Sequence, residues 1–441
     1  MKPIVRFLWI VLAVALAFGG TNASQAQALT SEAWRQDLEA LVRGIETRHV
    51  DPFHTVSDSA WRVAVQDVHD RIPMWAPHEV IVAFMELATM IGDGHTVVVP
   101  PFEGTQQFHR YGVDLYRFGD GLFVRSAEPR YHDLVGRRVV RLGRVPVDSL
   151  EHYVARVFPH DNEIGLWWGL QMTLPLAEVL HALGIAAEKN EVPLQVEDET
   201  GARHTRMLSR PQPVTAEWLQ TMLFEGAAAP DGWMSMRDPS TAPPEWLREI
   251  GTPYRYTYDR ERRLLHVHFN QVRTGDISFD AFLDSLFSRV DTSAIDALIL
   301  DLRTNEGGDL TMLTPMVRRL IAAEIGGTIG RLYVATGPRT FSAAGYLAAR
   351  LDVYTDAAFV GEPTGTRPNF IGETDPFELP NSGLWANAST LRWQGTYAFD
   401  DRPWIEPDLP APLTSTEYRQ NRDPVRETVW DALRSSSASQ E

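Results

Sequence analysis

The first part of the chain has the periodicity of amphipathic helices. Apolar residues recur three to four positions apart in three successive stretches between residues 30 and 91, the spacing that places them on one helix face. The stretches are marked by Trp34, Leu38, Leu41, Val42 and Ile45, then by Val63, Val65, Val68 and Ile72, and lastly by Ile81, Phe84, Met85, Leu87 and Met90. A Gly92-Asp93-Gly94 break and a short β-branched strand at 96–99 follow. The pattern predicts a helical N-terminal region over residues 29–105.

Between residues 106 and 212 the pattern changes to short strands separated by glycine-containing and charged turns. We expect strands at 113–116, 122–126 and 139–142, a helix near 150–157, and a closing pair of strands within 191–209. This arrangement is typical of a small β-rich module. Residues 213–252 are rich in proline, alanine and polar side chains, which favours a connector.

The third region, residues 253–436, alternates strand and helix patterns. Strands are predicted at 264–269, 297–300, 331–335 and 358–361, and helices at 279–290, 312–323 and 342–351. The wholly apolar strand at 297–300 is typical of a parallel strand buried on both faces. The fold class predicted is therefore α/β for this domain, within an α+β multidomain chain.

The N-terminus has the features of a bacterial signal peptide. Lys2 and Arg6 precede an apolar run over 7–18, and Ala26-Gln27-Ala28 offers small residues for cleavage. We expect residues 1–28 to be removed and the mature chain to be periplasmic or secreted, without an integral membrane span. An uncleaved N-terminal anchor is the alternative.

Composition excludes several classes of function. The net charge is −17 and the sequence has no basic run, so a nucleic-acid partner is not expected. The chain has no cysteine, which excludes a thiol nucleophile and thiolate metal ligands. No His-Glu-x-x-His motif and no phosphate-binding loop is present, so we expect no metal and no cofactor.

Two loops of the third region carry candidate chemistry. The segment 301–309, Asp-Leu-Arg-Thr-Asn-Glu-Gly-Gly-Asp, follows the buried strand, and backbone N–H groups at Gly307 or Gly308 can hold an oxyanion. Ser342 lies where a strand gives way to an alanine-rich helix, and the N–H of Ala343 can also face an oxyanion. A tight turn for the first loop and a plain helix cap for Ser342 are the alternatives.

Taken in order, these loops resemble the peptidase S41 family. The resemblance rests on Asp301 to Gly308, on Thr340-Phe341-Ser342-Ala343-Ala344, on the segment 359–365, and on Trp404-Ile405-Glu406-Pro407-Asp408. It implies a crotonase-like catalytic core, a PDZ-like β module, Ser342 as the nucleophile, and an oxyanion hole at Ala343 with Gly307 or Gly308. It also implies a peptide or protein substrate and no cofactor.

One departure from the Ser-Lys branch of the family concerns the general base. Arg367 stands where that branch has its lysine, and a guanidinium stays protonated, so Arg367 is instead expected to bind a substrate carboxylate. The tricorn-type branch takes its base from the segment before the β module, which points to His95 in Asp93-Gly94-His95-Thr96. His266 and His268 are fallback bases.

A third catalytic member should orient the histidine. Asp401 is the predicted orienting residue, because the tricorn-type pattern has an acidic residue near that position. Asp400, Glu373 and Asp93 are the alternatives for this role. The sequence thus predicts an exported serine peptidase, with Trp167-Trp168 as a candidate groove. The alternatives are a non-catalytic ligand- or peptide-binding protein on this fold and an esterase for small substrates. Oligomeric state and cleavage specificity stay open.

Overall fold

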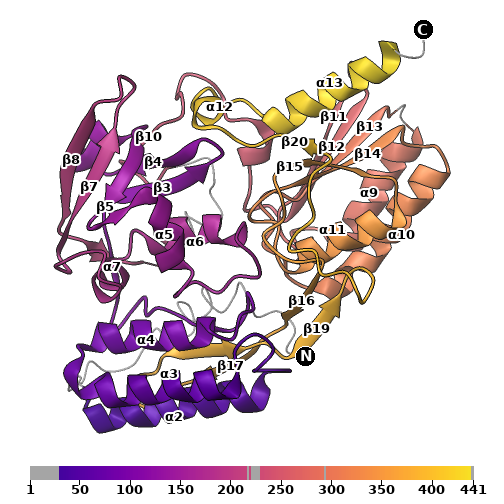
Figure 1. Cartoon of the computed structure of the whole chain (residues 1–441). Helices are drawn as coiled ribbons and strands as arrows, with labels where there is room; N and C mark the ends of the chain where they lie inside the picture. The colour runs from indigo at the N-terminus through magenta and orange to yellow at the C-terminus, as the bar shows by residue number, and fades with distance from the viewer. Residues whose placement is uncertain (1–28, 216–217, 220–228, 293–294, 439–441) are drawn as a thin grey trace.

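The computed structural model describes residues 29–215, 218–219, 229–292 and 295–438, so the predicted signal peptide lies outside the described residues. Helices and sheets are combined in three regions that lie side by side (Figure 1). Among the helices of the described residues, none is both long and apolar enough to cross a bilayer.

The N-terminal region forms the three predicted helices, α2 (Ser31–Arg48), α3 (Asp58–Arg71) and α4 (Pro77–Thr89). Residues 80–85 of α4 are all buried. A helix that is apolar around its whole circumference has to be covered on every side. Helix α4 therefore lies between the β module on one side and α2 and α3 on the other (Figure 1).

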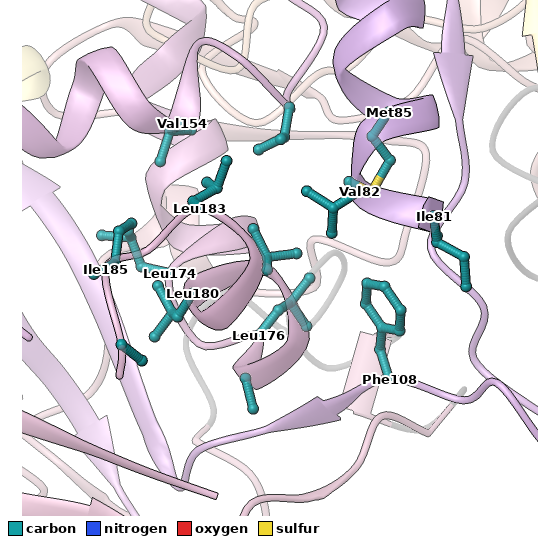
Figure 2. Packing of buried hydrophobic residues seen from close by; sticks show 14 of the residues in the cluster. Ile81, Val82, Met85, Phe108, Val154, Leu174, Leu176, Leu180, Leu183 and Ile185 are labelled. Carbon is teal, nitrogen blue, oxygen red and sulfur yellow. The ribbon is translucent and has the colours of Figure 1, made fainter. Parts of the chain in front are cut away.

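The helical region and the β module share one hydrophobic core. Figure 2 shows Val82 of α4 on the side of the helix that faces Leu176 and Leu180, which belong to the α7 (Ala177–Ala182) segment of the module, while Ile81 and Met85 lie on the same helix nearby. All of these side chains belong to a single cluster of buried residues. The two regions therefore hold each other in place, and the turn that follows α4 has a fixed position relative to the module.

The β module is a seven-stranded sheet in which β10-β4-β5-β7-β8 form the main order, with β3 beside β4 and β6 beside β5. Its elements are β3 (Val113–Phe118), β4 (Gly121–Ala127), β5 (Arg138–Leu142), β6 (Val145–Pro146), α5 (Val147–Val154), α6 (Gly165–Thr173), α7, β7 (Glu191–Glu197), β8 (Arg203–Ser209) and β10 (Met234–Ser235). Strand β10 comes from the segment predicted as a connector. It pairs antiparallel with β4, so part of that segment completes the sheet.

The third region has a six-stranded sheet of order β11-β12-β13-β14-β15-β20. Strand β11 (Tyr254–Asp259) is antiparallel to its neighbour and the others run parallel: β12 (Leu264–Phe269), β13 (Ala297–Asp301), β14 (Arg331–Thr336), β15 (Ala358–Gly361) and β20 (Leu409–Pro410). One face packs on α9 (Phe279–Thr292), α10 (Leu313–Ile325) and α11 (Ala343–Tyr354), the other on α13 (Pro424–Ala438). The strand–helix alternation predicted from the sequence is confirmed.

A long excursion between β15 and β20 reaches back to the N-terminal region, where Phe377 packs against Gly44 and Arg48 of α2. Strands β18 (Trp385–Ala388) and β17 (Asp375–Glu378) form a three-stranded sheet with β1 (Val97–Val98). The remaining elements include β2 (His109–Arg110), β9 (Gln212–Pro213), β16 (Asn369–Gly372), β19 (Leu391–Gln394) and α12 (Ser415–Arg419). The excursion fixes the segment just before β1, which contains His95, against the third region.

Candidate active site

Ser342 lies at the carboxyl-end side of the parallel sheet, between β14 and α11. Its backbone has φ 52° and ψ −123°, a conformation that costs a non-glycine residue free energy and recurs where a nucleophile is presented on a sharp strand-to-helix turn. Its side chain makes no capping hydrogen bond to α11. The alternative of a plain helix cap therefore has no support in the geometry.

His95 is the partner of Ser342. Its Nε2 lies 3.0 Å from Ser342 Oγ, although 247 positions separate the two residues in the sequence. The imidazole lies between two aromatic rings: its centroid is 4.7 Å from that of Phe341 and 5.8 Å from that of Phe370, and both pairs are stacked. The side chain is only 2% exposed. The two rings therefore restrict the imidazole to the plane in which it meets the hydroxyl.

The protonation state of His95 follows from its burial. Desolvation lowers the pKa of His95 to about 4, while the charge of Asp93 and a hydrogen bond with the backbone of Ile371 act in the opposite direction. The ring is therefore neutral at pH 7 and can accept a proton. To accept the proton of Ser342, the neutral ring must carry its own proton on Nδ1 and its lone pair on Nε2, the atom that contacts Ser342.

Asp93 holds the turn that carries His95. Its Oδ1 accepts hydrogen bonds from the N–H of His95 at 2.8 Å, from the N–H of Thr96 at 2.7 Å and from the hydroxyl of Ser389 at 2.6 Å. Its Oδ2 lies 3.0 Å from His49 Nε2. Burial by itself would raise the pKa of Asp93, but the hydrogen bonds from His49 and Ser389 outweigh it and lower the pKa to about 2. Asp93 is thus an ionised anchor for the backbone of the turn.

Asp161 connects this turn to the loop that contains Arg367. Its carboxylate accepts from the N–H of Gly94 at 2.8 Å and from the hydroxyl of Thr366. Burial raises the pKa of Asp161 to about 7, the hydrogen bonds from Thr366 and Gly94 oppose that shift, and the charge of Asp93 adds to it. A Cβ on Gly94 would lie 3.0 Å from Asp161 Oδ1 and 2.7 Å from the ring of Phe341. Glycine is therefore the residue that fits there.

The glycine loop after β13 lies directly against the nucleophile. A Cβ on Gly307 would be 2.7 Å from Ser342 Cβ and 2.8 Å from the nitrogen of Ala343. The N–H of Gly307 already donates to Asn305 Oδ1 at 2.9 Å. In the described part of the chain, the N–H groups of Gly308 and Ala343 have no protein acceptor. Of the three predicted oxyanion residues, these two can still donate to a ligand.

The predicted third member is not brought to the histidine. Asp401 is exposed, as is Glu373, and Asp400 pairs with Arg402. Of the competing carboxylates only Asp93 lies in the site, where it bonds to the backbone of the His95 turn. The two fallback histidines lie elsewhere, with Asp301.

Arg367 is exposed, and its Nε donates to the backbone oxygen of Asp161 at 2.9 Å. It therefore lies on the same loop network as Gly94 and Thr366. The contributions of Asp161 and Phe370 were not predicted from the sequence, because neither residue lies in a motif. Only their positions in the folded chain identify them.

An apolar cavity of about 210 Å³ lies beside the residues that directly precede His95 and Ser342 in the sequence. Gly94 and Phe341, the neighbours of the two reacting residues, form part of its wall. The rest of the lining comes from all three regions of the chain and includes Met85, Val98, Phe158, Trp168 and Trp385. Trp168 of the predicted Trp167-Trp168 groove thus lines the cavity. The pocket can hold an apolar group beside Phe341 and Gly94.

Comparison with known proteins identifies the fold. No protein-family model matches the sequence, and no curated protein matches it. Solved structures of CPAF, an S41-type peptidase, do match. A CPAF mutant is 10% identical with a TM-score of 0.58, covering 91% of this chain and 95% of its own. CPAF complexed with lactacystin is 11% identical with a TM-score of 0.56, covering 91% and 98%. The predicted α/β multidomain fold of the S41 type is confirmed.

Proposed function

We propose that this chain is a serine peptidase in which Ser342 is the nucleophile and His95 the general base. The observation that carries the proposal is the 3.0 Å contact between Ser342 Oγ and His95 Nε2. Two features make that contact more than a chance hydrogen bond. The Ser342 backbone is held at φ 52°, and His95 is neutral and stacked between two rings. Strained backbone and a fixed neutral imidazole are what an acyl-transfer site requires.

The reaction follows from these positions. Ser342 Oγ attacks the carbonyl carbon of the scissile bond while its proton passes to His95 Nε2. The N–H groups of Ala343 and Gly308 stabilise the oxyanion of the tetrahedral intermediate. The protonated imidazole then gives its proton to the leaving amine. In the second half of the reaction a water molecule, deprotonated by His95, releases the acyl group and restores the Ser342 hydroxyl.

The imidazolium formed in each half-reaction needs stabilisation in a buried site. The charge of Asp93 and the backbone hydrogen bond of Ile371 both favour the protonated ring. We therefore assign the orienting role to these two groups. Asp401, which the sequence suggested for this role, is exposed and could act only after a rearrangement of its loop.

The substrate is proposed to be a peptide or a protein segment. The apolar cavity beside Gly94 and Phe341 suits an apolar side chain near the scissile bond. The exposed guanidinium of Arg367, on the loop that Asp161 ties to the His95 turn, suits a carboxylate such as a peptide C-terminus. CPAF has been solved in complex with lactacystin, so a protein of similar fold binds that compound. With the predicted signal peptide, the place of action would be the periplasm or the exterior.

A fluorophosphonate probe tests the nucleophile directly. The mature chain, residues 29–441, is incubated with the probe and its peptides are analysed by mass spectrometry. We expect one covalent adduct, on Ser342, and loss of the adduct in Ser342→Ala. His95→Gln should slow labelling by about 1,000-fold or more, because the alcohol then has no base.

Two controls separate the competing functions. His204→Gln changes an exposed histidine that pairs with Asp198 and should label at the wild-type rate. Hydrolysis of peptides with apolar side chains, compared with small chromogenic esters, distinguishes a peptidase from an esterase. A folded wild-type chain that never labels, or that labels only as fast as His95→Gln, would favour the non-catalytic binding protein.

A further inference from the structure

A second group of chemically active side chains lies under the α13 face of the parallel sheet. His266 and His268 lie two positions apart on β12, so their side chains point to the same face of the sheet. The parallel register sets His268 beside Asp301, the last residue of β13. His266 is 3% exposed, His268 1% and Asp301 5%. Three side chains that commonly bind metals thus meet in a place closed to solvent.

The three side chains of this cluster lie close enough together for one ion to reach them all. One candidate ligand atom from each of the three residues lies within 4.8 Å of the other two. His266 Nε2 is 3.1 Å from Asp301 Oδ2, and the two imidazole centroids are 4.0 Å apart. Nitrogen and oxygen ligands around a tetrahedral zinc ion lie about 3.3 Å from one another. The separations of up to 4.8 Å exceed that value, so an ion would draw the three ligand atoms closer together.

Two ring nitrogens of the cluster lack partners. Within the described part of the chain, His266 Nδ1 and His268 Nε2 are buried and form no hydrogen bond. Buried polar atoms are nearly always paired, since leaving water without a new partner is costly. An imidazole gives only one of its nitrogens to an ion, and His266 Nε2 is the nitrogen beside Asp301. The unpartnered atom that bears on the site is therefore His268 Nε2, whose buried lone pair a cation would satisfy.

The charges around the cluster are compatible with a dication. Arg303 donates from Nε to Asp301 Oδ1 at 3.0 Å and from Nη2 to Asp301 Oδ2 at 2.7 Å, and its other terminal nitrogen donates to Asp423 Oδ1 at 2.8 Å. The two carboxylates therefore outweigh this guanidinium by one negative charge. The neighbouring Arg255 is paired with Glu245 at 3.5 Å. Arg303 would remain as the outer partner that orients the Asp301 carboxylate, a usual arrangement behind a metal ligand.

We propose that His266, His268 and Asp301 bind one transition-metal ion of the Zn²⁺ class. Two imidazoles and one carboxylate suit Zn²⁺ or Co²⁺, whereas Mg²⁺ and Ca²⁺ require oxygen ligands. The site departs from the expectation of no metal that the sequence suggested. Its position between β12 and the end of β13 gives it a structural role: it joins the two neighbouring strands. It takes no part in the chemistry at Ser342.

Metal content tests the proposal without reference to activity. The mature chain is expressed without a histidine tag in zinc-supplemented medium, dialysed, and analysed by inductively coupled plasma mass spectrometry. We expect one zinc ion per chain, and less than one tenth of that in His268→Gln and in His266→Gln. Cobalt-grown protein should show the visible d–d bands of tetrahedral Co²⁺ with nitrogen ligands. Growth in excess Mg²⁺ should leave no bound magnesium.

The matched control is His204→Gln, which removes a histidine from a surface His–carboxylate pair and should keep the full zinc content. Wild-type protein that contains no zinc and gives no cobalt spectrum overturns the proposal. So does zinc that persists unchanged in His268→Gln. If both cluster variants fail to fold, the wild-type zinc content and cobalt spectrum still decide the question, and neither depends on whether Ser342 is catalytic.

Discussion

His95 and His266 are both buried histidines whose Nε2 contacts a polar side chain, at 3.0 Å for Ser342 Oγ and at 3.1 Å for Asp301 Oδ2. The partner differs in what it can do. Ser342 is an alcohol, which becomes a nucleophile when it loses its proton. Asp301 is a carboxylate already held by Arg303, so it has no proton to lose and accepts one only with difficulty.

The surroundings of the two histidines differ as well. Ser342 is half-buried beside an apolar cavity and two backbone N–H groups. His266 lies within a strand whose six residues are all buried. A buried imidazole can act as a catalytic base only where its partner is a latent nucleophile and a substrate can reach it. Where neither holds, its lone pair is available for a metal ion instead.

The largest expected difference comes from exchanging each histidine for glutamine. His95→Gln removes the base and should lower kcat by about 1,000- to 1,000,000-fold, the range seen when one member of a catalytic unit is removed. His268→Gln should leave kcat of the folded protein close to the wild-type value, because His268 does not contact Ser342. Steady-state peptide hydrolysis measures both. Equal losses in the two variants would contradict the division of roles between the sites.

A smaller effect is expected from the glycine loop. In Gly307→Ala the new Cβ would meet Ser342 Cβ and the Ala343 nitrogen at a residue with φ 102°. Displacing an oxyanion donor typically costs about 100- to 1,000-fold in kcat, and we expect a loss of that order with little change in KM.

Gly327→Ala is the control for that substitution. Gly327 also has positive φ, at 66°, but a Cβ there has no neighbour within 4 Å. It should cost about 1 kcal/mol of stability and leave kcat unchanged. If Gly307→Ala were as active as Gly327→Ala, the loop would not be part of the oxyanion hole.

The network behind the His95 turn is tested by two changes at Asp161. Asp161→Ala leaves the N–H of Gly94 without its acceptor and should cost about 1–3 kcal/mol in the free energy of unfolding. Asp161→Asn keeps an acceptor there and should cost less. Chemical denaturation of both variants at several pH values measures these differences.

The pH dependence at Asp161 has a definite sign. Its folded pKa of about 7 lies above the ordinary value of 3.8, so the folded state binds the proton more tightly than the unfolded chain does. Its contribution to stability is then fully present below about pH 4 and is lost as the pH rises through 7. The free energy of unfolding of Asp161→Asn should therefore rise relative to that of the wild type as the pH is raised from 5 to 8. A constant difference across that range would show that Asp161 is ionised throughout.

The smallest effect is a shift of the acidic side of the pH profile of kcat/KM. Protonated His95 cannot accept the serine proton, so activity is retained above its pKa and lost below it. Because burial lowers that pKa to about 4, kcat/KM should be half-maximal near pH 4 in protein that circular dichroism shows to be folded. A midpoint near 6.5, the ordinary histidine value, would mean that the imidazole is more exposed to water in solution than in the structure.

The sequence by itself determined those features that local pattern encodes. The helical period of residues 31–48 and 77–89, the buried strand at 297–301, and the two glycine- and serine-containing loops are all readable from neighbouring residues. Parallel strands bring their carboxyl ends to one edge of a sheet, so the meeting of Gly307 with Ser342 also followed from the strand–helix order. The position of His95 was inferred from a resemblance to a family, and no local rule required it.

Tertiary structure alone decided what surrounds that histidine. Asp161, Phe370 and Asn387, whose side chain donates to the His95 carbonyl at 2.8 Å, come from three distant segments without any motif. The tertiary structure also placed β10, which belongs to a segment predicted as a connector, in the sheet of the β module. It left Asp401 exposed. Short-range patterns record backbone preference and the face that is buried. They do not record which distant segment covers that face, because many segments of similar hydrophobicity could do so, and only the packing of the whole chain selects one.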